Sequence, residues 1–200
     1  MTKTEYRDDL IAYLEKERDK EDGNAAMFAQ LRRGLGQPPG TSPQVSRVVQ
    51  HFLKGDYDPR ENAYYVIAPL FALHKKEGGV GNMGDHFHKL WKDNTTDPND
   101  DKPPPNLERR FISLLASSPE EFADALRQAV ALLKSNEVAV DWHKLMSDAQ
   151  IWLDTSDFAE TRRLKVKQIW SRRFWQLKDK QDNSKQTATE DSSVTESVSE

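Results

Sequence analysis

The sequence predicts an all-α fold of two helical lobes, and three observations indicate it. Apolar side chains recur every three to four residues along most of the chain, which is the period of an amphipathic helix. Residues that start and stop helices flank these segments. Few runs alternate with the period of two that a half-buried strand needs, and none is bounded like a hairpin. With 36% hydrophobic and 9% aromatic residues among 200, the chain can bury a core of ordinary domain size.

Residues 1–92 are expected to form the N-terminal lobe. The predicted helices are a segment from about 4 to 20, AAMFAQLRR before Gly34, SPQVSRVVQHFL, ENAYYVIAPLFALHKK and DHFHKLWKD. Ser42 followed by Pro43 is typical of a helix start, and Pro69 predicts a kink because proline lacks a backbone donor. The glycine-rich EGGVGNMG lacks the Gly-Lys-Ser/Thr ending of a phosphate loop, so we expect a flexible connector there.

Residues 93–106 predict a boundary, because this stretch is acidic and proline-rich and has no apolar side chain to bury before the next helix. The C-terminal lobe is expected over 107–180. Its predicted helices are NLERRFISLLAS, SPEEFADALRQAVALLKSN, VDWHKLMSDAQIWL and a long helix from about 157 to 180. Ser118-Pro119-Glu120-Glu121 has the pattern of a capping box with a proline at the first helical position, which makes it the clearest helix start in the chain.

The formal net charge of −4 is unevenly distributed. Of the 33 acids and 29 bases, residues 181–200 hold five acids and one lysine, so residues 1–180 are formally neutral. This C-terminal segment has almost no apolar residues and cannot offset the entropy cost of its own ordering. We therefore expect residues 181–200 to be a disordered acidic tail.

Composition excludes several classes of protein. The absence of cysteine excludes disulfides and thiolate metal sites and fits a reducing cytoplasm. The N-terminal residues lack the apolar stretch of a signal peptide, and no run reaches the roughly 18 apolar residues of a membrane span. We therefore expect a cytoplasmic protein with no membrane partner.

The histidines do not predict a metal site. His86 and His88 lie two residues apart and would point about 200° away from each other on a helix, so they cannot chelate one ion together. No HExxH motif or spaced carboxylate set accompanies them. We expect the histidines to face solvent or to form local hydrogen bonds. Because no triad or carboxylate pair is marked by local sequence, we expect no enzyme, no metal and no cofactor.

The arginines are more informative. Eight of thirteen fall in four adjacent pairs: Arg32-Arg33, Arg109-Arg110, Arg162-Arg163 and Arg172-Arg173. Neighbours on a helix diverge by about 100°, so each pair spreads two guanidinium groups over a strip of surface that suits a phosphate backbone. Alternatively, the arginines pair with nearby acids, for which Glu108 and Glu160 are within reach of their own helices.

The last predicted helix combines an apolar stripe with basic edges. An arc of about 140° holds its predicted core residues: Val166, Ile169, Trp170, Phe174 and Leu177. Lysines and arginines flank this arc on both edges: Lys165 and Arg172 on one, Lys167 and Lys178 on the other. Leu164 and Trp175 lie on the opposite side, so we expect them to contact another helix or another subunit.

The order and spacing of four motifs resemble the CasB family. These motifs are FAQLRRG, NLERRFISLLAS, VAVDWHKLMSDAQIWL and RRLKVKQIWSRRFW, and the resemblance spans about residues 5 to 178. CasB is the small subunit of the type I-E CRISPR RNA-guided surveillance complex, Cascade. The resemblance implies a non-catalytic subunit of two helical lobes, present in two copies beside the CRISPR RNA and the other Cascade subunits.

In this family, a basic surface holds the target DNA and the displaced non-target strand and so stabilises the R-loop. Carried over motif by motif, the resemblance implies these nucleic-acid-binding residues: Arg32, Arg33, Arg109, Arg110, Arg162, Arg163, Lys165, Lys167, Arg172 and Arg173. The acidic 93–106 connector and the acidic tail depart from the family pattern. Because acidic segments repel DNA, they are expected to lie away from the strand path or to act as a weak self-shield.

Two other readings compete with this one. A helix-turn-helix regulator would need a tight turn before its recognition helix, and LDTSD before the last predicted helix permits such a turn. A purely structural adaptor would use all its arginine pairs in protein interfaces. Salt distinguishes a nucleic-acid-binding protein from the adaptor, because counterion release weakens nucleic-acid binding steeply as ionic strength rises, whereas the adaptor would show no such binding.

Overall fold

The structure is a computed structural model that describes residues 9–20, 23–55, 58–95 and 102–176. Every regular element in these ranges is helical, so the all-α prediction is confirmed. The elements are α1 (Leu10–Arg18), α2 (Ala25–Arg32), α3 (Pro43–Val49), a 3-10 turn η1 (Gln50–Phe52), α4 (Glu61–Leu73), α5 (Met83–Asp93), α6 (Pro105–Ala116), α7 (Phe122–Ser135), α8 (Trp142–Trp152) and α9 (Ala159–Trp175). The predicted tail, 181–200, lies outside the described residues.

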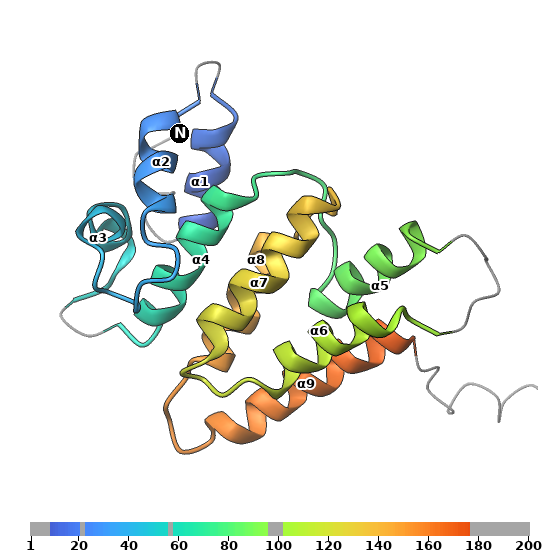
Figure 1. Cartoon of the computed structure of the whole chain (residues 1–200). Coiled ribbons are helices and arrows are strands. Elements are labelled where there is room, and N and C mark those ends of the chain that lie inside the picture. The colour runs from blue at the N-terminus through green and yellow to red at the C-terminus, as the bar shows by residue number, and fades with distance from the viewer. Residues whose placement is uncertain (1–8, 21–22, 56–57, 96–101, 177–200) are drawn as a thin grey trace, which may run out of the picture.

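Helices α1 to α4 gather at one end of the molecule, α5, α6 and α9 at the other, and α7 and α8 lie between them (Figure 1). One hydrophobic cluster runs through all three groups, from Leu10 to Phe174. Helix α4 is almost entirely buried, because α1, α2, α3, α7 and α8 all pack against it. Its apolar sequence explains this position, since a helix that is hydrophobic on every side belongs inside a fold.

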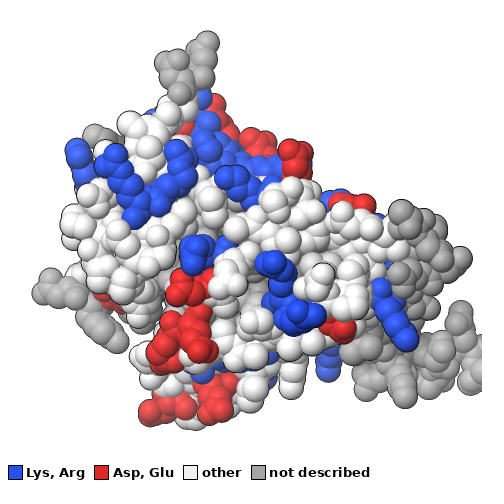
Figure 2. Space-filling view, in the orientation of Figure 1, with Lys and Arg blue, Asp and Glu red and all other residues white. Residues whose placement is uncertain are grey.

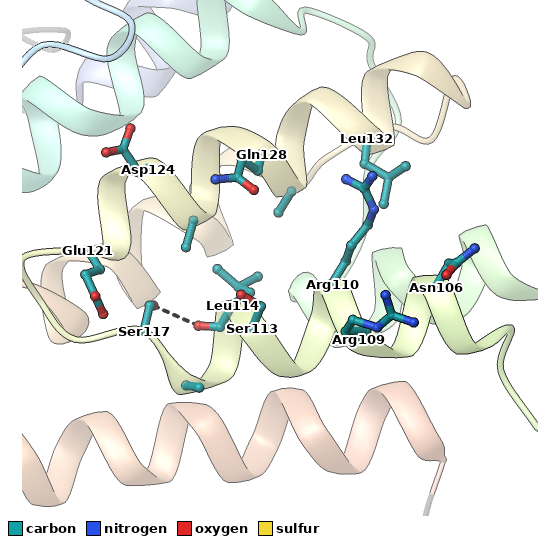
Figure 3. Close-up of a pocket in the computed structure, with 13 residues that line it drawn as sticks. Asn106, Arg109, Arg110, Ser113, Leu114, Ser117, Glu121, Asp124, Gln128 and Leu132 are labelled. Atoms are coloured by element: carbon teal, nitrogen blue, oxygen red, sulfur yellow. Dashed lines mark hydrogen bonds between the residues drawn. The ribbon is translucent and has the colours of Figure 1, made fainter.

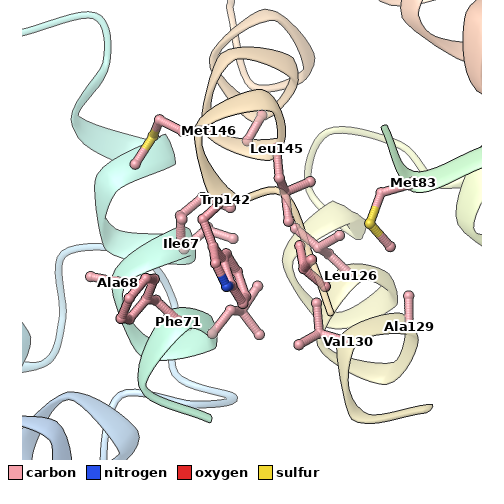
Figure 4. Packing of buried hydrophobic residues seen from close by; sticks show 14 of the residues in the cluster. Ile67, Ala68, Phe71, Met83, Leu126, Ala129, Val130, Trp142, Leu145 and Met146 are labelled. Carbon is pink, nitrogen blue, oxygen red and sulfur yellow. The ribbon is translucent and has the colours of Figure 1, made fainter. Parts of the chain in front are cut away.

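The middle of the core joins α4 to α7 and α8. Phe71 of α4 packs against Trp142 of α8 with their ring centroids 5.5 Å apart. Leu126 and Val130 of α7 complete the contact on the other side of Trp142 (Figure 4). Pro69 lies inside α4, which continues to Leu73.

Helix α5 makes its closest packing with α9, and Gly84 explains why the two helices approach so closely. A side-chain Cβ at Gly84 would lie 2.9 Å from Arg173 Cβ and closer still to the carbonyl oxygen of Trp170. One turn further along, Phe87 packs against Phe111 of α6 and Phe174 of α9. By its contacts α5 therefore belongs with α6 and α9. The division into lobes at 93–106 stays a prediction, and part of that stretch, 96–101, lies outside the described residues.

The glycine-rich segment before α5 is a packed junction rather than the loose connector expected from its composition. A Cβ at Gly79 would overlap the backbone of Val140 and Asp141. Asp141 Oδ2 accepts a hydrogen bond from the amide of Gly81 at 3.2 Å, and its Oδ1 caps the start of α8 through the amide of Lys144 at 2.9 Å. One carboxylate thus ties the 78–82 segment to α8.

The predicted capping box forms, but the helix begins later than expected. The amide of Ser118 donates to Glu121 Oε2 at 3.2 Å and the amide of Glu121 donates to Ser118 Oγ at 3.3 Å. These are the two reciprocal bonds of the motif, yet α7 starts only at Phe122. At α3 the predicted start is confirmed at Pro43, although the side chain of Ser42 makes no capping bond.

His86 corrects the expectation that the histidines face solvent or bond locally. Its side chain is buried, and its Nε2 accepts a hydrogen bond from the amide of Asp141 at 3.0 Å, 55 residues along the chain. Burial lowers the pKa of His86 to about 4, against the opposing charges of Asp141 and Asp85. His74 is also buried, its Nε2 bonded to the Val138 carbonyl at 2.7 Å, and burial lowers its pKa as well.

Acidification should therefore destabilise the fold through His86. The unfolded chain takes up a proton there near pH 6.5, whereas the folded chain does so only near 4. The stabilisation is complete above pH 6.5 and is lost as pH falls towards 4, with a loss of about 2 kcal/mol between pH 7 and pH 5. Urea unfolding of the parent and of His86→Gln at both pH values measures it. Between pH 7 and pH 5, His86→Gln should lose about 2 kcal/mol less of its free energy of unfolding than the parent does. Equal losses in the two proteins would show that His86 is not the source of the pH dependence.

Candidate nucleic-acid interface

The ten predicted nucleic-acid-binding side chains do not form a single patch. They lie at the end of α2, on the first turns of α6 and along α9. Figure 2 shows basic side chains gathered over α1, α2 and α4, a second basic group over α6 and α7, and an acidic column over the N-terminal end of α7. Each pair is therefore judged by the contacts that its own side chains make.

Arg109 and Arg110 are exposed, and neither side chain has a hydrogen-bond or ion-pair partner among the described residues. The expected local partner, Glu108, is occupied, since its Oε1 accepts a hydrogen bond from Trp175 Nε1 at 3.1 Å. This contact comes from a residue 67 positions away, so no short-range pattern could indicate it. The alternative of a local ion pair fails at this position, and both guanidinium groups face solvent.

The two arginines line one end of a groove of about 820 Å³ between α6 and α7. Figure 3 shows Arg110 extending across the groove towards Leu132, and Arg109 beside Asn106. Glu121 and Asp124 lie at the opposite end (Figure 3). The groove is thus positive at one end and negative at the other, so a polyanion is attracted only to the arginine end.

The floor of the groove is made of small and apolar side chains. Leu114 and Ala129 are buried there, and Ala125 and Leu132 are half-buried. Short side chains on facing helices leave the space that defines the groove.

The pair at the end of α2 is divided between two roles. Arg32 Nη1 donates to the carbonyl of Ala72 at 3.2 Å, which ties α2 to the last turn of α4. Arg33 is exposed, and within the described residues its side chain has no partner. Arg33 is thus the member of this pair whose side chain is not engaged within the described fold, while Arg32 is exposed but also bonded to α4.

Arg162, Arg163 and Lys167 are engaged within the fold. Arg163 donates to the carbonyls of Trp152 at 2.8 Å and Asp154 at 3.1 Å, which satisfies acceptors at the end of α8. Arg162 pairs with the carboxylate of Asp154. Glu160, the expected partner on the same helix, is not involved. The turn that a helix-turn-helix reading would need is thus held by these two arginines.

Lys167 is half-buried beneath α8. Its Nζ lies 4.9 Å from the centre of the Trp152 ring and donates to the Ser117 carbonyl at 3.3 Å. Burial lowers its pKa. The other basic residues of α9 face outward: Lys165 is exposed without a described partner, Arg172 is exposed, and Arg173 Nε lies 3.7 Å from Asp85 Oδ1.

Trp175 makes one of the two contacts expected of it, because it packs against another helix, α6, and a role for Trp175 in a partner interface stays a prediction. It is half-buried, donates to Glu108 as described, and packs edge-on against Phe111 at 5.7 Å and Phe174 at 4.9 Å. Ile169, expected in the core, is 47% exposed, and Leu164 is 50% exposed. The unpartnered apolar residues of α9 are therefore Leu164 and Ile169, and a role for Leu164 in a partner interface stays a prediction.

Two other features are absent from the described residues. Across these ranges, no three His, Cys, Asp or Glu residues lie close enough together to hold a metal ion. In the same part of the chain, no helix is both long and apolar enough to cross a membrane. The described residues thus form an all-helical fold whose candidate site is a groove with two exposed arginines at one end.

The family follows from comparison with known proteins. The family model of CRISPR-associated protein Cse2 matches residues 27–175, and the chain belongs to this family. The CRISPR-associated protein Cse2 of Thermus thermophilus is 31% identical over 152 residues, which cover 75% of this chain and 79% of that protein.

Solved structures agree with this assignment. The crystal structure of CasB from Thermus thermophilus matches at 28% identity with a TM-score of 0.62, over 84% of this chain and 96% of that one. The resemblance to CasB is therefore confirmed. A chain of a CRISPR RNA-guided surveillance complex shares the fold at a TM-score of 0.64 and 21% identity, over 84% of this chain and 92% of that one.

Proposed function

We propose that this chain is a non-catalytic subunit of a CRISPR RNA-guided surveillance complex, Cascade, and that Arg109 and Arg110 contact the DNA strands of the R-loop. The observation that carries the proposal is the exposed arginine pair whose local acid is bound to Trp175. Arg33 and Lys165, exposed and without described partners, are secondary candidates. The partners are the other Cascade subunits, the CRISPR RNA, the target and non-target strands and a second copy of this chain, all in the cytoplasm.

The physics of strand exchange suits such a surface. Opening a DNA duplex and forming an RNA–DNA heteroduplex nearly balance, so modest contacts to the phosphate backbone can tip the exchange. Contacts of this kind are independent of sequence and weak when taken singly. Because residues 1–180 are formally neutral, binding by the isolated subunit should be weak. Incorporation into a complex raises the effective concentration of the surface at the DNA.

The test is the double charge reversal Arg109→Glu/Arg110→Glu in a reconstituted complex. Affinity for target DNA should fall roughly 10- to 100-fold near 0.1 M salt, and the slope of log affinity against log salt should become shallower by about two. The melting temperature of the subunit should not change, because neither arginine has a partner within the described fold.

A matched control changes the charge equally elsewhere. Lys76→Glu/Lys89→Glu reverses two exposed lysines, each of which pairs, among the described residues, with one exposed acid: Lys76 with Glu137 and Lys89 with Asp93. This variant should bind target DNA within about threefold of the parent, because surface ion pairs contribute little. Reversal at Arg162-Arg163 is unsuitable, because it also removes the bonds to the Trp152 and Asp154 carbonyls. If Arg109→Glu/Arg110→Glu binds DNA as the parent does, the structural adaptor is the better reading.

A further inference from the structure

The C-terminal end of α9 lies against the helix that carries the arginine pair. Trp175 is the last residue of α9, and its ring nitrogen is bonded to Glu108, the neighbour of Arg109 on α6. Phe111, one turn along α6, packs against the same tryptophan. Whatever follows residue 176 therefore starts beside the arginine end of the α6–α7 groove.

The sequence that follows is complementary to this end of the groove. Residues 186–200, QTATEDSSVTESVSE, contain four acids and no base. Two valines, Val194 and Val198, alternate with these acids among serines and threonines. The groove offers two unpartnered guanidinium groups at one end and a floor of Leu114, Ala125 and Ala129. The acidic end of the groove, at Glu121 and Asp124, would repel the same segment, so the segment is expected to bind at the arginine end.

We propose that the acidic segment 186–200 docks on the Arg109–Arg110 end of the α6–α7 groove and competes there with nucleic acid. The contact itself depends only on the groove and the charge of the segment, whereas the competition rests on the proposed function. The segment acts as an intramolecular polyanion that a DNA strand displaces. Free subunit is thereby shielded from unspecific nucleic acid, while a strand presented by the assembled complex wins the exchange.

The chain is long enough to make this contact. Thirteen residues lie between Gln176 and Glu190, and an unstructured chain of that length has a typical end-to-end distance of about 20 Å. The first target, Arg109, lies on the same helix as the residue that Trp175 contacts. A tether of this length supplies a local concentration of about a millimolar, which suffices for a weak electrostatic contact.

The absence of cysteine makes the contact directly measurable. A single Ser193→Cys variant of the full chain, carrying a nitroxide label, should broaden the amide NMR signals of Arg110 and Gln128 more than that of Ser46, which lies in α3 on the other side of the molecule (Figure 1). Two changes should each abolish this broadening: Arg109→Glu/Arg110→Glu in the groove, and the isosteric set Glu190→Gln, Asp191→Asn, Glu196→Gln and Glu200→Gln in the segment. Broadening that is absent, or that survives both changes, would overturn the docking.

The competition has its own readout in the reconstituted complex. The neutralised segment should raise affinity for target DNA three- to tenfold, and it should have no effect when Arg109→Glu/Arg110→Glu is present. If NMR shows the docked segment but neutralising the segment leaves DNA affinity unchanged, the segment docks without competing with DNA. That result would overturn both the competition and the assignment of the two arginines to DNA binding. Higher affinity without any NMR contact would instead reflect net charge alone and overturn the docking.

Discussion

Replacing Gly84 with alanine should lower the free energy of unfolding by about 3 kcal/mol or more, the largest effect expected of so small a change. Alanine normally stabilises a helix relative to glycine by up to about 1 kcal/mol. Here its methyl group would meet the backbone of Trp170 and the Cβ of Arg173 on α9, and neither can move without shifting a helix. For a chain of this length the melting temperature should fall by about 10 °C.

Gly78→Ala provides the matched control. Gly78 has a φ of +85° and open space around its Cβ position, so its substitution costs only backbone strain, about 1 kcal/mol. Gly84 needs glycine for the opposite reason, since its space and not its backbone angle is restricted. Equal losses for the two variants would contradict the close approach of α5 and α9. Below its melting temperature Gly84→Ala should still bind DNA, because α5 supports α6 through Phe87 and Phe111 without contacting the groove.

The helices were predictable because their signals are local. Apolar periodicity and Ser, Pro, Asp and Gly at segment ends placed each described helix within a few residues. What failed depends on contacts distant in sequence. Ile169 fell inside the predicted core arc of α9, yet it is 47% exposed. The width of the buried face of α9 depends on where α5, α6 and α8 pack against it. The local sequence of α9 does not encode the positions of these helices.

The sequence predicted which arginines could bind phosphate, but it could not predict which of them the fold leaves free to do so. Adjacent arginines mark surface that can bind phosphate, and the sequence treats all four pairs alike. The fold separates them through single distant contacts: Arg163 finds the carbonyl of Trp152, and Trp175 removes Glu108 from Arg109 and Arg110. Arginine is versatile enough for either role, so the deciding information lies in the tertiary structure.

Replacing Trp170 with alanine should lower the free energy of unfolding by about 3 to 5 kcal/mol, enough to leave much of the protein unfolded well below the melting temperature of the parent. Its ring is fully buried and packs against Trp152 at 5.1 Å. Its Nε1 also donates to Asp148 Oδ2 at 2.9 Å, and this carboxylate is itself buried. Trp170→Phe keeps most of the packing and removes the donor, so it should cost about 1 to 3 kcal/mol by leaving a buried acceptor unpaired.

A double-mutant cycle separates packing from hydrogen bonding. Asp148 has a second partner, Lys144 Nζ at 2.6 Å, which is 43% exposed and can turn to solvent when the carboxylate is lost. Asp148→Ala alone leaves the indole N–H of Trp170 buried without an acceptor, while the double variant Asp148→Ala/Trp170→Phe leaves neither group unpaired. The double variant should therefore be destabilised by at least about 1 kcal/mol less than the sum of the two single variants, as measured by urea unfolding. Additive losses would show that the bond between α8 and α9 contributes nothing beyond the packing of the ring.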